Sequence, residues 1–489
     1  MLDPLVLGVV LASAVYGLFI GSIPGLSATM AVALLVPVTF FLPPLPAVAC
    51  MVTATAMAIF AGDVPSALLR MPGTPASAAY CDEAFALTRK GQVDLVLGAG
   101  LVFSAIGGLI GTLVLATAAP WLAEIALQFS SFEYFWLVML GVTAAVFVSP
   151  ARPVKALVSL SIGLLVATVG FENPAAYPRF TFGSVHLMSG FQLIPVMTGM
   201  FAVSEVVRYA VSSAPAIEAP RQAIRRIFKG QGRLIRTYPL PLLRGSVVGT
   251  LIGALPGAGA DIAAWIAYAI SKRFSKTPEK FGTGHIEGIV EAGAANNSAL
   301  SGAWIPALVF GIPGDSITAI VIGVLYLKGL NPGPTIFIEN AQNVYAVFII
   351  FFLANLLMLP LGWLLIRLAR NVLRVPRHVL MPIILLFSVV GAFAINNSVF
   401  DVGVMLAFGL LAYFMEANGF PIAPTILGMV LGAMLEQNFV TSMIKADGSP
   451  LAFFGRPIAA GLGVVTILVW LSPLVIGLLK RGRVPSNAE

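Results

Sequence analysis

The chain has 489 residues, of which 58% are hydrophobic and only 10% are charged, and its mean hydropathy is +0.96. A typical soluble protein carries about 25% charged residues, so the composition excludes a water-soluble fold and predicts an integral membrane protein. The pI of about 9.5 does not indicate nucleic-acid binding, because the basic residues lie in loops between apolar runs, where the orientation of membrane helices requires them.

The first apolar run contains a pair of residues that breaks helices. Long runs separated by short polar loops favour helices over a barrel of alternating short strands. Met1–Ile23 lacks a basic n-region and an A-x-A site, so we expect it to belong to the mature protein. Within "GLFIGSIPGLSATMAVALLVP", Pro24 removes a backbone donor and Gly25 tolerates unusual backbone angles. Such a break is tolerated at membrane depth only beside protein or a water-filled cavity.

A second break follows at Pro72-Gly73, in "RMPGTPASA". Arg70 is the basic residue nearest to a break, and it either attracts an anion or extends to the membrane interface. Asp63 is a further acidic candidate. Cys50 and Cys81 lie among apolar or small residues, so we expect packing residues and neither a disulfide nor a metal pair.

The middle of the chain is a basic polar stretch, Val211–Thr237, with six Lys or Arg residues against one acid. The positive-inside rule places it in the cytoplasm. We therefore expect a first membrane repeat (1–210), a basic cytoplasmic linker (211–240), a second membrane repeat (241–480) and a cytoplasmic tail (481–489). The C-terminus is expected in the cytoplasm and the N-terminus on the periplasmic side.

The second half repeats both breaks. Pro256-Gly257 in "GTLIGALPGAGADIAA" matches the first break, and Pro313-Gly314 in "IPALVFGIPGDSITA" matches the second. Basic "SKRFSK" flanks the second-half segment, whereas the first-half flanks carry no Lys or Arg, which indicates opposite orientations. The expected fold is an all-α polytopic membrane protein with about 10–12 transmembrane helices, re-entrant or broken helices, and two inverted-topology repeats, as in many secondary transporters.

The breaks also predict a binding site. Exposed amides and the positive N-termini of half-helices can hold an anion, and small polar residues follow each break. The candidate substrate-binding residues are Pro24, Gly25, Ser27, Thr29, Gly73, Thr74, Ser77, Pro256, Gly257, Gly259, Asn296, Asn297, Gly314, Ser316 and Thr318. The two asparagines are expected to donate to a carboxylate or accept a Na⁺, or else to pack helices together by hydrogen bonds.

The candidate cation-coupling residues are Asp261, Asp315 and Glu291, since carboxylates at membrane depth usually serve an ion or a proton. Asp261 aligns with Thr29 and could instead cap its half-helix. Glu287 and Glu291 share one helical face, where they either share a proton or cation or lie at a solvated helix end. We expect no catalytic residue, no cofactor and no metal beyond a possible coupling Na⁺.

Several motifs together resemble one family: "GSIPGLSATMAVALLVP", "RMPGTPASAA", "GALPGAGADIAAWIAYAISKRFSK", "FGTGHIEGIVEAGAANNSA" and "GIPGDSITAIVIGVLYLKGLNPGP". They are similar to the signatures of TctA-type permeases, the large membrane subunit of tripartite tricarboxylate transporters, from about Gly17 to Glu436. The resemblance implies a bacterial inner-membrane secondary transporter that carries citrate or related organic anions with Na⁺ or H⁺. It also implies a small four-helix membrane partner (TctB-type) and a periplasmic solute-binding protein (TctC-type).

This chain departs from the family pattern in two places. It reads "AGDVPSA" where members often have Gly-Gly-Ser, and Asp82-Glu83 where they often have Asp-Gly. Both places are expected to lie near the site, so the substrate could differ from citrate. An extra acid near the site would disfavour a highly charged anion.

Other function classes fit the sequence less well. An intramembrane enzyme is disfavoured because there are only three histidines and neither an H-E-x-x-H nor a G-x-S-x-G motif. The absence of a Gly-x-x-x-x-Gly-Lys-[Ser/Thr] loop disfavours a primary pump. A channel, or a structural membrane subunit without its own site, is the remaining alternative, and inverted repeats with midplane breaks favour alternating access over a static pore.

Overall fold

The computed structural model describes residues 3–147, 152–171, 177–211, 224, 226–373 and 377–481. The regular structure of these residues is helical, apart from an isolated bridge between Gly170 and Arg179. The helices of the first half are α1 (Pro4–Gly21), α2 (Ala28–Phe40), α3 (Pro44–Ala61), α4 (Asp63–Leu69), η1 (Ser77–Tyr80), α5 (Cys81–Arg89), α6 (Val93–Ala126), α7 (Ser131–Phe147), α8 (Pro153–Ala167), η2 (Val185–Leu187), α9 (Leu193–Thr198), η3 (Gly199–Val203) and α10 (Ser204–Val211).

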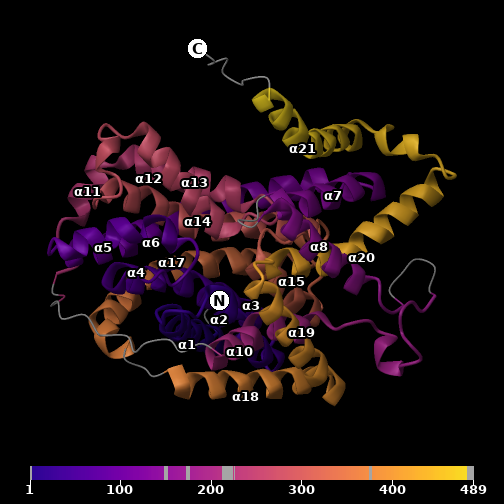
Figure 1. Ribbon diagram of the computed structural model, residues 1–489, viewed down its shortest axis with the longest axis horizontal. Helices are drawn as coiled ribbons and strands as arrows, with labels where there is room; N and C mark the ends of the chain where they lie inside the picture. Colours follow the sequence, from indigo (N-terminus) through magenta and orange to yellow (C-terminus); the bar gives the residue numbers. More distant parts are fainter. Residues whose placement is uncertain are drawn as a thin grey trace, which may run out of the picture.

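The second half continues the same pattern of long helices and short breaks (Figure 1). Its helices are α11 (Gln231–Thr237), α12 (Pro239–Gly253), α13 (Gly259–Phe274), η4 (Pro278–Lys280), α14 (Ile286–Phe310), α15 (Ser316–Leu327), α16 (Ile336–Glu339), α17 (Ala341–Val372), α18 (Arg377–Asn396), α19 (Val399–Ala417), α20 (Ile422–Lys445), η5 (Pro450–Phe454) and α21 (Pro457–Arg481).

Within the described ranges, 8 helical segments are long and apolar enough to cross a membrane. They are Pro4–Gly21, Pro44–Leu69, Val93–Ala126, Leu193–Val211, Ala341–Ala369, His378–Asn396, Val399–Ala417 and Ile422–Lys445. Shorter apolar helices accompany them, including Ala28–Phe40 and Ser316–Leu327, which begin at the helix breaks. These observations confirm the predicted all-α polytopic membrane protein.

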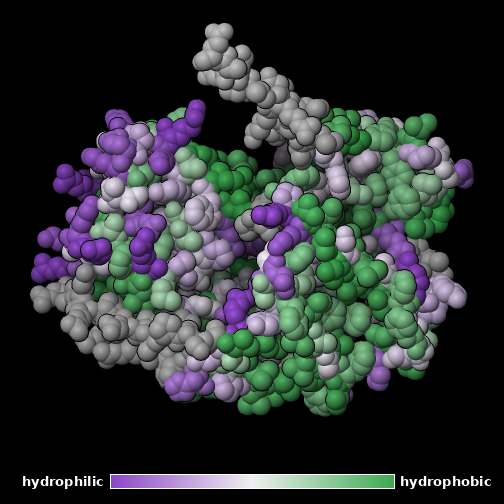
Figure 2. Space-filling model, in the orientation of Figure 1, coloured by the Kyte–Doolittle hydropathy of each residue, from purple (hydrophilic) through white to green (hydrophobic). Residues whose placement is uncertain are grey.

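The surface fits this assignment. Figure 2 shows hydrophobic residues over the part of the molecule formed by α18, α19 and α20, and hydrophilic residues at the end that holds α5 and α11. Large apolar side chains such as Leu386, Phe387 and Val390 on α18 are more than half exposed. Apolar surface on this scale marks a face that lies against lipid or another protein.

The Gly-x-x-x-Gly part of the repeat serves helix packing. A Cβ atom at Gly17 would lie 2.3 Å from the carbonyl oxygen of Ala54, so only glycine lets α1 lie directly against α3. The equivalent Cβ atom at Gly249 would lie 2.4 Å from the carbonyl oxygen of Ala295, where α12 lies against α14. Small residues that allow close backbone approach are a common basis of helix association in membranes.

Helices of each half pack against helices of the other half. Helix α6 of the first half packs along α14 of the second, and α17 of the second half packs along α3 of the first (Figure 1). This reciprocal packing agrees with the internal repeat, while the opposite orientation of the two halves stays a prediction.

Two predicted segments lie partly outside the described residues. These are residues 212–223 and 225 of the linker, and the tail from residue 482. The end of the linker forms α11, where the Gln231 amide donates to the Leu95 carbonyl at 3.1 Å. Cys50 and Cys81 are buried free thiols, as predicted. Burial raises the pKa of the Cys81 thiol to about 11, so this side chain stays neutral.

Candidate functional site

The four helix breaks meet at a single cavity of about 620 Å³. Each break contributes residues to its wall, although the breaks are far apart in the sequence. These residues are Gly25 and Ser27 from the first break, Pro72–Pro75 from the second, Gly257–Asp261 from the third, and Asp315 and Ser316 from the fourth. The ends of the broken helices therefore face a cavity, which is the condition under which such breaks are tolerated in a membrane protein.

The first and third breaks have the same local geometry. Gly25 and Gly257 have φ angles of +89° and +81°, which lie in the left-handed region that favours glycine. After the first break, the Ser27 hydroxyl accepts a hydrogen bond from the Met30 N–H at 3.1 Å and caps α2. Gly25 and Gly257 therefore turn the chain so that the N-terminus of the following helix borders the cavity.

The second and fourth breaks share a reciprocal pair of hydrogen bonds. The Ser77 N–H donates to Thr74 Oγ1 at 3.1 Å, and the Thr74 N–H donates to Ser77 Oγ at 3.1 Å. In the same way, the Thr318 N–H donates to Asp315 Oδ1 at 2.7 Å, and the Asp315 N–H donates to Thr318 Oγ1 at 2.9 Å. Positions paired by the sequence repeat thus make equivalent bonds, and Asp315 is an N-cap residue as well as part of the cavity wall.

Asp261 does not cap its own helix. The N-cap position of α13 is Ala258, and it makes no side-chain capping bond. Asp261 Oδ1 instead accepts from the Ala76 N–H of the first half at 3.2 Å, and Trp265 Nε1 donates to the Pro75 carbonyl at 3.2 Å. The start of α13 is therefore attached to the break in the opposite half of the chain.

Glycine is also required where two breaks touch. Gly259 has a φ of +58°, and a Cβ atom there would lie 2.6 Å from Asp315 Cβ. The third and fourth breaks are in direct contact at this point, so the carboxylates of Asp261 and Asp315 are held in one part of the cavity.

The structure brings most of the predicted site residues together. Those that border the cavity are Gly25, Ser27, Thr29, Gly73, Thr74, Gly257, Gly259, Asn296, Ser316, Asp261 and Asp315. Those that do not are Pro24, Ser77, Pro256, Asn297, Gly314, Thr318 and Glu291. Ser77 and Thr318 make the reciprocal hydrogen bonds with Thr74 and Asp315. The Asn297 amide donates to Met358 Sδ at 3.4 Å between two helices.

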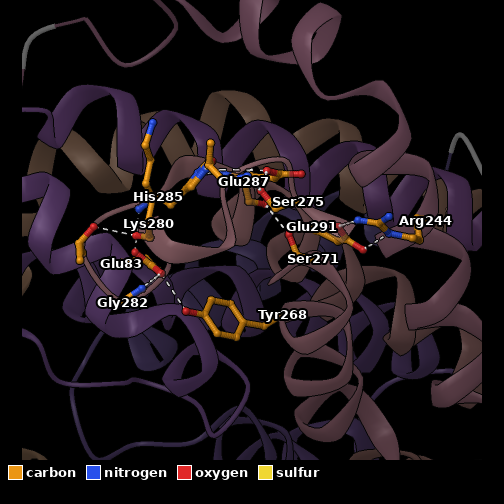
Figure 3. A network of polar contacts seen from close by, with 12 residues as sticks. Glu83, Arg244, Tyr268, Ser271, Ser275, Lys280, Gly282, His285, Glu287 and Glu291 are labelled. Carbon is orange, nitrogen blue, oxygen red and sulfur yellow. Dashed lines mark hydrogen bonds and ion pairs between the residues drawn. The ribbon is translucent and has the colours of Figure 1, made fainter. Parts of the chain in front are cut away.

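Glu291 has a different environment from the one we expected. Its buried carboxylate pairs with Arg244 of α12, with Arg244 Nε 2.5 Å from Glu291 Oε1. Glu287 accepts a hydrogen bond from Ser275 Oγ at 2.6 Å, and Figure 3 shows the two acids directed to these separate partners. Glu291 therefore serves the contact between α12 and α14 rather than the cavity wall.

The acids at the family departure, Asp82 and Glu83, also lie away from the cavity. Asp82 is exposed and pairs with Arg70 at 2.8 Å, so Arg70 does not reach the cavity either. Glu83 is buried and accepts hydrogen bonds from Tyr268 Oη at 2.8 Å and from backbone N–H groups of a second-half loop (Figure 3). Asp82 and Glu83 therefore lie away from the cavity, contrary to the expectation for this departure.

An ion-pair cluster at the cavity wall could not be predicted from the sequence. Arg208 of α10 pairs with Glu416 of α19 and, at 2.9 Å, with Glu205, and all three border the cavity. Of the described residues that border the cavity, Arg208 is the one basic residue. The i, i+3 spacing of Glu205 and Arg208 is visible in the sequence, but nothing local connects Arg208 to a partner 208 residues away.

A multi-pass helical membrane fold whose broken helices meet at one cavity is the architecture of a membrane transport protein. Residues 7–427 match the family model described as "Tripartite tricarboxylate transporter TctA family". The chain belongs to this family, whose members are permease subunits of tripartite tricarboxylate transporters.

Two proteins of Agrobacterium vitis are similar to this chain. "Uncharacterized 52.8 kDa protein in TAR-I ttuC' 3'region" is 32% identical over 467 residues, which are 96% of this chain and 92% of that protein. "Uncharacterized protein in TAR-II ttuC' 3'region" is 36% identical over 230 residues, which are 46% of this chain and 95% of that protein. No solved structure matches the chain.

Proposed function

We propose that this chain is the permease of a binding-protein-dependent secondary transporter, which imports an organic anion with carboxylate groups across a bacterial inner membrane. A Na⁺ or H⁺ gradient drives the import. The observation that carries the proposal is the meeting of four helix breaks, two from each half, at one cavity whose wall includes Asp261 and Asp315. In secondary transporters, discontinuous helices from internal repeats form the substrate and coupling-ion sites near the bilayer midplane.

The cavity wall contains the N-termini of helices, which can hold an anion. The first residues of α2, α13 and α15 border it, and the N-terminus of a helix carries about half a positive charge with free N–H groups. Arg208 also borders the cavity, but its charge is paired with Glu205 and Glu416. The volume of about 620 Å³ is typical of a small-molecule site, which spans about 300–1,000 Å³.

The same cavity carries an excess of carboxylates. Asp261, Asp315, Glu205 and Glu416 border it, against the single Arg208. An anion that enters such a site is repelled unless protons or cations neutralise part of this charge. This arrangement supports coupled transport, in which the anion and the cation bind together, with Asp261 and Asp315 as the residues that receive the cation.

Family membership supports the remaining parts of the proposal. A small four-helix TctB-type membrane subunit and a periplasmic TctC-type solute-binding protein complete the transporter, and citrate or a related carboxylate is the substrate. The test is uptake of labelled mono-, di- and tricarboxylates by cells that contain this chain, the small subunit and the binding protein, under imposed Na⁺ or H⁺ gradients. Uptake should require the binding protein and one gradient, and no uptake of any acid with all components present would refute the proposal.

Replacing Asp261 with Asn should weaken the response to the coupling cation. Loss of one charged ligand costs on the order of 1.5–3 kcal/mol, so the cation concentration for half-maximal uptake should rise roughly tenfold or more. Asp82→Asn is the matched control, because Asp82 is exposed and lies outside the cavity. A cation dependence that is the same in Asp261→Asn and the control would leave Asp261 as a structural link to Ala76.

A further inference from the structure

A buried acid that the proposed site does not use lies behind the cavity wall. Asp63 begins α4, inside the span Pro44–Leu69, and is 6% exposed. Its Oδ1 accepts a hydrogen bond from Tyr80 Oη at 2.5 Å, while its Oδ2 is buried without a partner. Gly100 of α6 faces this oxygen, and a Cβ atom there would lie 3.4 Å from Oδ2. The structure therefore leaves room for the carboxyl group but gives it only one hydrogen bond.

Tyr80 connects this acid to the cavity. The Asn296 amide nitrogen donates to Tyr80 Oη at 3.3 Å, and the Asn296 amide oxygen is buried without a partner. Asn296 borders the cavity that the helix breaks form. A chain of hydrogen bonds thus runs from a buried carboxyl group to the cavity wall, and it has an unpaired oxygen at each end.

No cation compensates Asp63 among the described residues. Of the elements packed against α4, η1 contributes Tyr80, and α5 contributes Cys81, whose thiol donates to the Ser66 carbonyl at 3.6 Å. Helix α3 carries no charged residue, and α6 presents Gly100. A carboxylate without a counter-ion is costly in such surroundings, and binding a proton removes that cost.

We infer that Asp63 is a proton-binding residue of the transport cycle, and that Tyr80 and Asn296 transmit its protonation to the cavity wall. This inference rests on the proposed transport function and identifies the coupling ion as H⁺. In the carboxylate form, Tyr80 donates to Asp63 and accepts from the Asn296 amide nitrogen, as the structure shows. The amide group of Asn296 is then engaged away from a bound anion.

Protonation of Asp63 reverses the direction of the hydrogen bonds from Asp63 through Tyr80 to Asn296. A hydronium ion from the solution gives one proton to Asp63 and leaves as water, and the new O–H group donates to Tyr80 Oη. The Tyr80 hydroxyl then donates to the Asn296 amide oxygen, and the amide turns over so that its NH₂ group can donate to a substrate carboxylate. No other proton is transferred, and release of the proton restores the first arrangement. Proton binding and anion binding therefore strengthen each other by the same factor, as linkage requires.

The test uses cells that contain the whole transporter, a pH gradient or a Na⁺ gradient, and the labelled acid of the panel that wild-type transports best. Asp63→Asn is nearly isosteric, neutral and able to donate to Tyr80, so it mimics the protonated form. It should lose accumulation driven by the pH gradient and keep exchange of labelled for unlabelled acid. Retained exchange also shows that the variant is folded. Tyr80→Phe should reduce pH-driven accumulation, and the exposed control Asp82→Asn should behave as wild-type.

Infrared spectroscopy of the purified transporter gives a readout that needs no substrate. Wild-type should show the C=O band of a protonated carboxyl group that Asp63→Asn lacks. A missing band, or Asp63→Asn cells that still accumulate acid with the pH gradient, would overturn the inference. Wild-type uptake driven by Na⁺ alone would also overturn it but leave the proposed function standing. Absence of any wild-type uptake would refute the proposed function, and the infrared band would still decide whether Asp63 binds a proton.

Discussion

Replacing Glu83 with Ala should lower the free energy of unfolding by about 3 kcal/mol or more, because unpaired buried donors cost about 1–3 kcal/mol each. The Glu83 carboxylate accepts from Tyr268 Oη at 2.8 Å, from the Gly284 N–H at 2.6 Å and from the His285 N–H at 2.7 Å, and also from the Gly282 N–H. All four donors lose their acceptor in the variant (Figure 3). Thermal unfolding of the purified chain in detergent measures the effect.

The chain provides a matched control in the neighbouring acid. Asp82→Ala removes an exposed pair with Arg70, and exposed pairs contribute only about 0–1 kcal/mol. Tyr268→Phe removes a single donor, so its cost should be about 1 kcal/mol. Equal melting temperatures for Glu83→Ala and Asp82→Ala would mean that the network does not stabilise the fold.

The position of Glu83 gives its network a role beyond stability. Glu83 lies on α5 of the first half, and the loop that it binds leads directly into α14 of the second half. Helix α14 carries Asn296 to the cavity, and its first turns are held by the Glu287 and Glu291 contacts. The network therefore fixes one end of the helix that forms part of the cavity wall.

The helix breaks could be predicted from the sequence because their causes are local. Proline and glycine act on their own backbone angles, and Thr74 and Asp315 accept hydrogen bonds from N–H groups only three residues later. The internal repeat could be recognised for the same reason, because positions aligned by sequence make the same hydrogen bonds. The family resemblance was also confirmed, and four of its five motifs contain a helix break.

The partners of the charged residues could not be predicted, because they depend on how distant helices pack. The i, i+4 spacing of Glu287 and Glu291 suggests mutual repulsion. Arg244, which lies on another helix, instead forms an ion pair with Glu291. Asp82 and Glu83 are adjacent in the sequence, yet one is exposed and the other is buried beneath a loop from the opposite half. Tertiary contacts therefore decided which acids reach the cavity.

Gly259→Ala should reduce uptake by at least about tenfold with little loss of folded protein. A side chain at this φ of +58° costs about 1–2 kcal/mol, and its Cβ atom would meet Asp315 Cβ at 2.6 Å. The third and fourth breaks must then separate, which displaces Asp261 and Asp315 from their places in the cavity. Uptake per molecule of folded protein in the membrane measures the effect.

Gly91→Ala distinguishes this displacement from backbone strain. Gly91 has a similar backbone angle, φ +79°, but a Cβ atom there meets nothing within 4 Å. The control should therefore carry the strain without the clash, so its uptake should remain near that of wild-type. If the two variants transport equally well, contact between the third and fourth breaks does not govern transport, and the carboxylates of the cavity work without a fixed separation.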